Sequence, residues 1–155
     1  CAKSCADRTS GTRRDRHRKR AIDQIQGHGI TVNGCFILGL DGTGPESFDE
    51  VWKFVRDSGL YEVQITVQTA FPGTPLYERL RQEGRLLREN AWELCTLFDV
   101  NLKPSGMSVA ELESGFLALA GKIYSDDFIK ERQDRFFARR RQQMRGVTDT
   151  QELTS

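Results

Sequence analysis

At 155 residues the chain has the length of one ordinary domain, and its 37% hydrophobic and 29% charged residues are typical of a soluble globular protein. The net charge of +1 gives no overall reason to expect binding to nucleic acid or to a membrane surface. No stretch approaches the roughly 18 apolar residues that cross a bilayer, and the start lacks the apolar run of a secretory signal. We therefore expect a cytoplasmic protein without a transmembrane segment.

Residues 1–20 form a basic and polar segment, with eight Lys or Arg residues against Asp7 and Asp15. Almost no large apolar residue is present to offset the entropy of ordering, so we expect residues 1–20 to be disordered. A solvated tail is the favoured interpretation. A nucleic-acid or acidic-lipid patch is disfavoured because no aromatics are interleaved, and a translation artefact is a third alternative. Because the chain starts at Cys1 rather than methionine, upstream sequence is expected to be missing.

Ordered structure is expected from Ala21, where a short apolar stripe predicts a helix that ends at residues 27–29, Gly-His-Gly. Residues 30–38 follow and are rich in β-branched and aromatic side chains. They become nearly apolar on both faces, which is typical of a buried parallel strand. Cys35 lies inside this run, where a buried thiol is the common interpretation.

A helix and a second strand come next. Thr43 and Glu46 have the spacing of a capping box for a helix that ends at Gly59. Residues 62–69 then alternate between apolar and polar side chains, as a strand does. Strand, helix and strand at this spacing predict a parallel βαβ unit.

Both strands of such a unit end at the same edge of the sheet. Residues 39–42, Gly-Leu-Asp-Gly, and residues 71–75, Phe-Pro-Gly-Thr-Pro, would therefore meet there. Open α/β sheets and barrels bind their ligands at this carboxyl edge, although glycines after strands often only make turns.

Three further helices are predicted downstream. Thr74 and Pro75 have the pattern of a cap and first helical position. Ser108 and Glu111 form a second capping box, and Ser125 is expected to cap a last helix. Trp52, Trp92, Phe136 and Phe137 are interpreted as helix-packing residues.

The amino-acid sequence of these segments resembles the C-terminal half of cobalamin-binding radical S-adenosylmethionine (SAM) proteins, including the group that contains the hopanoid C-methylases. The likeness rests on residues 34–42, Gly-Cys-Phe-Ile-Leu-Gly-Leu-Asp-Gly, on residues 71–77, Phe-Pro-Gly-Thr-Pro-Leu-Tyr, and on the later capping residues. It implies an α/β fold in which residues 21–90 are the last part of a radical SAM (β/α) barrel. Residues 91–145 would be a helical C-terminal extension, and residues 146–155 a disordered tail.

The resemblance also implies which residues contact SAM. The family's fifth strand carries a Gly-x-Ile-x-Gly-x-x-Glu pattern against the adenine; here Ile37 and Gly39 match, Cys35 replaces the first glycine, and Gly42 stands at the acidic position. Asp41 is the neighbouring acid that would substitute. Residues near the next strand end would border the same pocket: Gln68, Thr69 and Phe71.

Gln64, Thr66 and Gln68 form a polar row along the second strand. On a barrel strand this row would face the lumen and bind SAM or substrate; on an exposed edge strand it would face solvent. Phe71 has a similar pair of interpretations, which are stacking on a ligand and filling the barrel mouth.

The iron–sulfur cysteines of the family are not matched. Radical SAM enzymes hold a 4Fe–4S cluster with Cys-x₃-Cys-x₂-Cys. Cys1 and Cys5 have the first spacing, but Arg8 stands at the third position, so we interpret the pair as coincidence. His17 and His28 lack partners at metal-ligand spacing and are expected to face solvent. No metal ligand and no catalytic residue is assigned in this chain.

The resemblance implies a parent enzyme that cleaves SAM to a 5′-deoxyadenosyl radical and transfers a methyl group with cobalamin. The cluster and cobalamin would be bound by the missing N-terminal part, and the substrate would be a small molecule, with lipid-like molecules as candidates. This chain would supply SAM-adenine contacts and a substrate-side wall from its terminal helices, and would be inactive alone. The alternative is a non-catalytic interaction module with a basic arm, without specific nucleic-acid binding.

Overall fold

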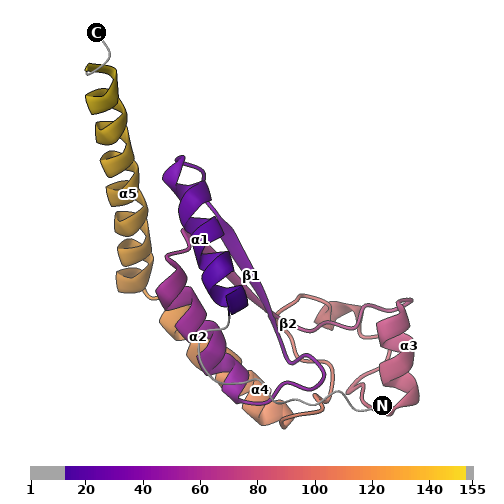
Figure 1. The fold of residues 1–155 in the computed structure, drawn as a ribbon. Helices are drawn as coiled ribbons and strands as arrows, with labels where there is room; N and C mark the ends of the chain where they lie inside the picture. Colours follow the sequence, from indigo (N-terminus) through magenta and orange to yellow (C-terminus); the bar gives the residue numbers. More distant parts are fainter. Residues whose placement is uncertain (1–12, 153–155) are drawn as a thin grey trace.

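The computed structural model describes the backbone of residues 13–152 and the side chains of residues 15–143 (Figure 1). Within these residues the chain is an α/β protein with five α-helices and one two-stranded sheet. The order is α1 (Arg13–Gly27), β1 (Asn33–Leu38), α2 (Glu46–Ser58), β2 (Glu62–Val67), α3 (Pro75–Gln82), a 3₁₀ turn (Trp92–Leu94), α4 (Val109–Ile123) and α5 (Asp126–Glu152).

The two strands are parallel, which confirms the predicted βαβ unit. Leu38 stands opposite Val67 at the carboxyl ends of the pair. The N–H of Gln68 donates to the C=O of Leu38 at 2.8 Å, so the pairing extends one residue beyond β2. The two strand ends are thereby fixed side by side.

One face of the sheet is covered by helices. Leu38, Ile65 and Val67 on this face are almost fully buried, and they pack in one apolar cluster with residues of α2 and α4. The helical members are spaced by three, four and seven positions, which is the spacing that puts side chains on one helical face. They include Val55, Leu112, Leu119 and Ile123. Burial of these side chains supplies the main core.

The opposite face of the sheet is open. Cys35 and Gln64 are exposed, and the side chain of Ile37 is 55% accessible. The prediction that the first strand is buried on both faces, with a buried Cys35 thiol, is therefore wrong for the described chain. The residues are apolar as expected, but no described helix lies on this side.

Several predicted boundaries also differ. Residues 13–20, expected to be disordered, form the first half of α1, where the Lys19 ammonium pairs with Asp57 at 3.4 Å. The capping box of Thr43 is wrong: Pro45 is the N-cap of α2, and the Thr43 hydroxyl donates to the C=O of Leu40 instead. Helix α5 continues beyond residue 145 to Glu152.

The predicted starts of α3 and α4 are confirmed. Thr74 caps α3 by accepting the N–H of Tyr77, and Ser108 and Glu111 form the expected capping box of α4. Ser125 precedes α5, but its hydroxyl donates backward to the C=O of Lys122.

Helix α3 belongs to a small lobe beyond the carboxyl ends of the strands, apart from the other helices (Figure 1). This lobe has a core of its own that contains Ala70, Tyr77, Leu80 and Leu102. An isolated antiparallel bridge between Leu86 and Leu102 closes it. The lobe therefore lies next to the edge where a ligand is expected.

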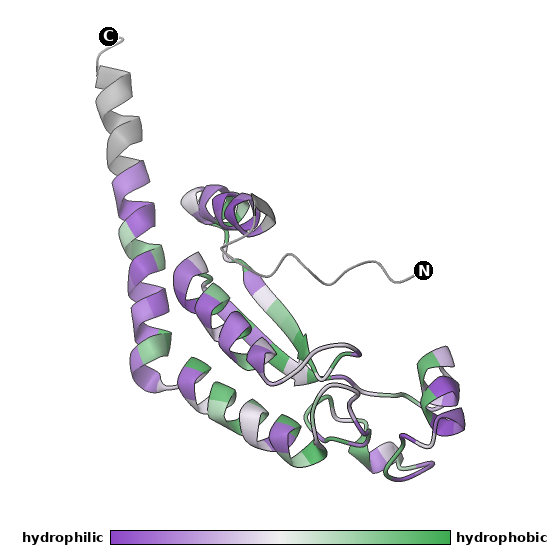
Figure 2. Cartoon of the chain, turned by 60° about the horizontal axis from the view of Figure 1, so that its bottom comes forward, coloured by the Kyte–Doolittle hydropathy of each residue, from purple (hydrophilic) through white to green (hydrophobic). Residues whose placement is uncertain are grey.

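Figure 2 shows a mainly hydrophilic α5 with isolated apolar positions, and more hydrophobic strands. The α5 residue Phe136 is buried and its ring lies 4.8 Å from that of Tyr61, whereas Phe137 is partly exposed. Among residues 13–152, no helix is both long enough and apolar enough to cross a membrane.

Candidate functional site

The candidate site lies at the carboxyl edge of the sheet, where β1 ends at Leu38 and β2 ends at Val67. The hydrogen bond between Gln68 and Leu38 brings the residues after the two strands together. Ile37, Gly39, Gln68 and Thr69 thus lie along one short stretch of this edge, as the sequence predicted. Asp41 and Phe71 lie in the loops that lead away from it.

Position 39 requires glycine for two reasons, its backbone conformation and a neighbouring side chain. Its φ of +76° is a conformation that side-chain-bearing residues rarely adopt. A Cβ atom at this position would stand 2.8 Å from Cδ2 of Leu112 in α4. The side chain of Leu112 therefore occupies the space next to Gly39 on the helix-covered side of the sheet. At this position the glycine allows the helix to pack closely, rather than a ligand to approach.

Ile37 presents an apolar surface on the open face of the sheet. It stands opposite Thr66 in the register, and Cys35 stands opposite Gln64, with its Sγ 3.9 Å from Gln64 Oε1. The polar row of β2 therefore shares the open face with Ile37. This arrangement fits either of the two sequence interpretations, a barrel lumen or an exposed face.

Gln68 carries an unmatched polar atom. Its side-chain Oε1 is buried, yet no hydrogen-bond donor among the described residues reaches it. A buried carbonyl oxygen without a donor is costly, typically by about 1–3 kcal/mol. The neighbouring Thr69 hydroxyl is satisfied, because it donates to the C=O of Val67 at 3.2 Å.

Asp41 is held in two ion pairs. Its two carboxylate oxygens accept from Arg85 and from Arg79, each at 2.7 Å. The hydrogen bond from Arg85, followed by that from Arg79, holds the pKa of Asp41 below its ordinary value against the opposing effect of burial. Asp41 is thus an ionic anchor to the α3 lobe. The role suggested for it, as a substitute for the family's acidic SAM contact, stays a prediction.

Phe71 lies at the start of the loop that leads into α3, and 41% of its surface is accessible. Its C=O accepts both the N–H and the hydroxyl of Thr74, which fixes the turn. The two interpretations of Phe71, stacking on a ligand and filling the barrel mouth, both stay predictions.

The sequence interpretation missed the turn around Leu97. The C=O of Leu97 accepts the N–H of Val67 at 2.8 Å, so this turn lies along the outer edge of β2. Leu97 has a φ of +71°, which is strained for a leucine, and the Thr96 hydroxyl accepts the N–H groups of Phe98 and Asp99. Thr and Asp three residues apart are turn-forming residues, and this spacing was the available signal.

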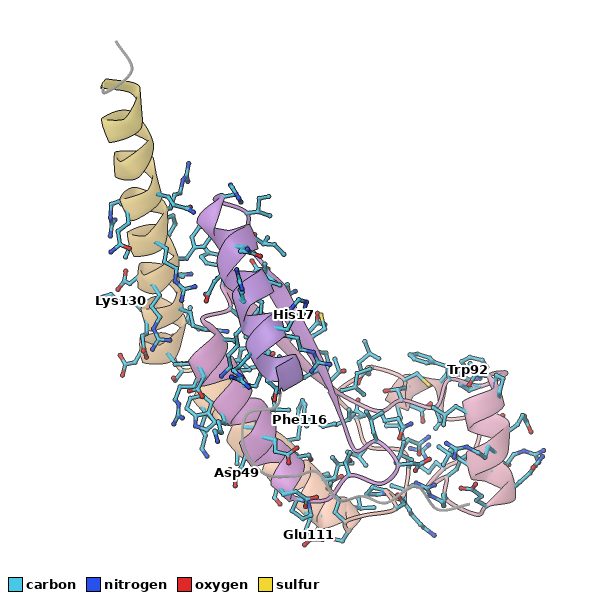
Figure 3. All side chains as sticks on the ribbon, viewed as in Figure 1. His17, Asp49, Trp92, Glu111, Phe116 and Lys130 are labelled. Carbon is cyan, nitrogen blue, oxygen red and sulfur yellow. The ribbon has the colours of Figure 1, made fainter. Side chains whose placement is uncertain are left out.

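Exposed aromatic side chains gather in the same lobe. Phe98 is 56% and Trp92 65% accessible, and Trp92 lies beside α3, away from the other helices (Figure 3). The interpretation of Trp92 as a helix-packing residue is therefore wrong, whereas Trp52 does pack, with its ring 4.9 Å from that of Phe128. The lobe presents aromatic surface next to the candidate site.

The substrate-side wall that the sequence suggested for the terminal helices stays a prediction. Helix α4 packs on the covered face of the sheet through Leu112, Leu119 and Ile123. The first turn of α4 also reaches the carboxyl edge, because Leu112 Cδ2 would stand 2.8 Å from a Cβ at Gly39. The exposed loops after α3 are a second candidate for that wall.

Potential metal ligands are few within the described part of the chain. No group of three His, Cys, Asp or Glu side chains converges there. His17 and His28 are exposed, as predicted. Cys1, Cys5 and Arg8 lie outside the described residues.

Comparison with known proteins gives one family and several relatives. The family described as a domain of unknown function, DUF4070, matches residues 74–154. A bacteriochlorophyllide d C-12(1)-methyltransferase of Chlorobaculum tepidum is 23% identical over 79% of this chain and 26% of its own length. A hopanoid C-2 methylase of Rhodopseudomonas palustris is 38% identical over 44% of this chain and 13% of its own length.

A third relative, an anaerobic magnesium-protoporphyrin IX monomethyl ester cyclase of Rubrivivax gelatinosus, is 27% identical over 61% of this chain. That match covers 16% of the cyclase. The chain thus spans about a quarter or less of each of these three relatives.

Proposed function

We propose that this chain, which belongs to the DUF4070 family and corresponds to the C-terminal part of a cobalamin-binding radical SAM protein, lines the SAM-binding end of its parent enzyme. The relatives indicate the radical SAM methyltransferase family. The parent would therefore transfer a methyl group to a small molecule.

We further propose that β1 and β2 are the last strands of a partial (β/α) barrel whose interior is the open face of the sheet. The bonds from Glu62 to Val32 and from Gln68 to Leu38 imply that the alternate residues Cys35 and Ile37 turn their N–H and C=O groups away from β2. The outer edge of β1, with its unpaired N–H and C=O groups, can therefore pair with another strand. The apolar Ile37 on an uncovered face supports the same arrangement.

The outer edge of β2 differs, which supports its place as the last strand. The N–H of Ile65 donates to the Tyr124 hydroxyl at 3.2 Å, and the N–H of Val67 donates to Leu97. These donors are thus matched by a side chain and a loop rather than by a strand. A sheet that ends at β2 and continues beyond β1 would fit the final strands of a barrel.

The SAM proposal is carried by the unmatched Oε1 of Gln68, one residue after the end of β2, and by the exposed Ile37 one residue before the end of β1. An adenine needs an apolar surface and a hydrogen-bond acceptor for its amino group, and these two side chains would supply both. Thr69 and Phe71 would border the ring, and Gly39 would set the course of the chain beneath it. Bound SAM, together with a 4Fe–4S cluster held by the rest of the parent, would supply the 5′-deoxyadenosyl radical.

The substrate would lie against the exposed aromatic side chains of the α3 lobe. Phe71, Trp92 and Phe98 are exposed aromatic side chains of the segment after β2, and together they would offer apolar surface to a lipid-like small molecule. The names of the relatives include a hopanoid and a bacteriochlorophyllide, which supports this substrate class. Cobalamin, like the cluster, would be held outside this chain.

The test is SAM affinity in the parent enzyme after Gln68→Leu. Loss of one buried acceptor should weaken binding by about tenfold, because the partner amino group is left unpaired. Gln82→Leu on the exposed surface of α3 is the matched control and should leave affinity unchanged. An unaltered affinity in Gln68→Leu would remove Gln68 from the site.

The alternative, an interaction module with a basic arm, has less support. Lys19 pairs with Asp57 and lies over the Phe54 ring, so at least this residue of the basic segment is used in internal packing. The genomic sequence upstream of Cys1 separates the two functions. An in-frame cobalamin domain with Cys-x₃-Cys-x₂-Cys supports the enzyme, and a start codon close to Cys1 supports the module.

A further inference from the structure

A pocket of about 390 Å³ lies at the amino ends of the strands. Its walls come from the starts of β1 and β2 and from α5, and they include Glu62, Gln64, Arg132 and Gln133. The lining residue nearest to the carboxyl end of β2 is Gln64, three residues before Val67, so the pocket ends roughly 10 Å short of the carboxyl edge. It is therefore separate from the proposed SAM site.

Arg132 is the unusual residue of this pocket, because its charge is buried without a counter-charge. Only 4% of its surface is accessible, and no carboxylate of the described residues lies within 4.0 Å of its guanidinium. Nη2 donates to the C=O of Ile123 at 3.2 Å, and the guanidinium lies 5.1 Å from the centre of the Phe128 ring. Nε and Nη1 are buried and have no hydrogen-bond partner.

A buried guanidinium of this kind is unfavourable unless a counter-charge or hydrogen-bond acceptors pair with it. Desolvation of a single unpaired ion costs several kcal/mol, and the same desolvation lowers the pKa of Arg132. The contact with the Phe128 ring and one peptide oxygen offset only part of this cost. A negatively charged oxygen within reach of Nε and Nη1 would offset much more.

Other donors face the same pocket. The strand register turns the N–H of Val63, like those of Ile65 and Val67, toward the outer edge of β2. Ile65 and Val67 donate to Tyr124 and Leu97, but Val63 lines the pocket. The amides of Gln64 and Gln133 add neutral donors. Among the described residues that line the pocket, Glu62 is the one acid, and it forms no ion pair with Arg132.

We propose that this pocket binds a small molecule that carries a carboxylate or phosphate group, with Arg132 as the residue that holds the oxyanion. The volume favours a free ligand over a single acidic side chain, because pockets of roughly 300–1,000 Å³ are typical of small-molecule sites. Nε and Nη1 of Arg132 are closed to solvent in the unliganded chain, so a shift of this side chain toward the pocket accompanies binding and brings both donors to the anionic oxygens. Val63 and Gln133 supply further N–H groups. The site lies toward the amino ends of the strands, whereas the proposed SAM site lies at their carboxyl ends.

The experiment follows the Nε–H NMR signal of Arg132 in the 155-residue chain during titration with inorganic phosphate and, separately, with acetate. We expect a saturable shift with a Kd of about 1 mM for at least one of them, the strength of two or three charge-assisted hydrogen bonds. Arg132→Lys should weaken binding about tenfold, since it removes the planar donor pair. Arg141→Gln, an exposed arginine further along α5, should leave the Kd unchanged.

Glu62→Gln gives a second and independent variant, because it does not alter the buried guanidinium. Removal of this negative charge should tighten anion binding severalfold. The proposal is overturned if neither anion gives a saturable shift. It is likewise overturned if Arg132→Lys binds the anion as tightly as the unaltered chain does, because the signal would then report an adventitious ion only. It is also overturned if Glu62→Gln destabilises the chain and the double variant is non-additive, because Arg132 would then pair with Glu62 in solution.

Discussion

Asp41 and Arg85 form an ion pair of 2.7 Å between Oδ1 and Nη2, which joins the loop after β1 to the segment after α3. Arg85 also donates from Nε to the C=O of Lys103 at 2.9 Å, and Arg79 occupies the second carboxylate oxygen of Asp41. Arg85 thus connects the loop after β1 with the segment that contains Lys103. This contact sets where the α3 lobe lies relative to the strand ends.

Replacement of Asp41 by Asn should destabilise the chain at neutral pH by about 1 kcal/mol, since both ion pairs are partly exposed. The folded-state pKa of Asp41 is lowered, so its contribution is complete above the unfolded value and is lost as the pH falls through the folded value. The difference in unfolding free energy between the two proteins should therefore shrink below about pH 4. Chemical denaturation at a series of pH values measures it.

Glu113→Gln is a control for the general effect of removing an acid, because Glu113 is an exposed residue of α4. It should leave the unfolding free energy nearly unchanged at every pH. A difference between Asp41→Asn and the unaltered chain that persists undiminished at low pH would contradict the ion-pair account.

Gly39→Ala should cost more stability than Gly73→Ala. Both glycines have a positive φ, +76° and +83°, so both substitutions incur the backbone penalty of about 1 kcal/mol. Only Gly39 has a close neighbour, with Leu112 Cδ2 at 2.8 Å from the added Cβ, whereas nothing lies within 4 Å at Gly73. Thermal unfolding of the two variants isolates the steric part, and equal losses would argue against the Leu112 contact.

Gln26→Leu should be strongly destabilising, because the side chain connects α1 to the turn between α2 and β2. Its Nε2 donates to the C=O of Gly59 at 2.8 Å, its Oε1 accepts the N–H of Tyr61 at 2.9 Å, and the residue is fully buried. Two backbone groups would lose partners, at about 1–3 kcal/mol each. Gln24→Leu, on the exposed face of the same helix, should change the unfolding free energy little.

Local signals in the sequence predicted local features of this fold well. The Thr74 cap and the Ser108 capping box depend on residues three apart, and the structure contains both. The alternation after Glu62 identified β2, and the apolar run identified β1. Parallel pairing then followed from the length of the connection between them.

Features that depend on distant contacts could not be predicted in this way. The apolar pattern of β1 was interpreted as burial on both faces, but pattern alone does not tell which neighbours are present. The ion pairs of Asp41 could not be predicted, because its partners Arg79 and Arg85 lie about 40 residues away in sequence. Arg132 had no distinguishing signal, because its burial depends on tertiary packing, including the contact of its Nη2 with the C=O of Ile123 at the end of α4.

The open face of the sheet makes Cys35 a probe of the proposed barrel. In a chain with Cys1 and Cys5 replaced by serine, the exposed Cys35 should react with a thiol reagent faster than the half-buried Cys95. If the face lines a barrel interior in the parent enzyme, the Cys35 thiol should react at least about tenfold more slowly there than in the chain alone, because access limits the reaction. Added SAM should slow it further, while Cys95 serves as the internal reference. A Cys35 that reacts equally fast in the parent and in the chain alone would show that this face stays open, and the partial barrel would have to be abandoned.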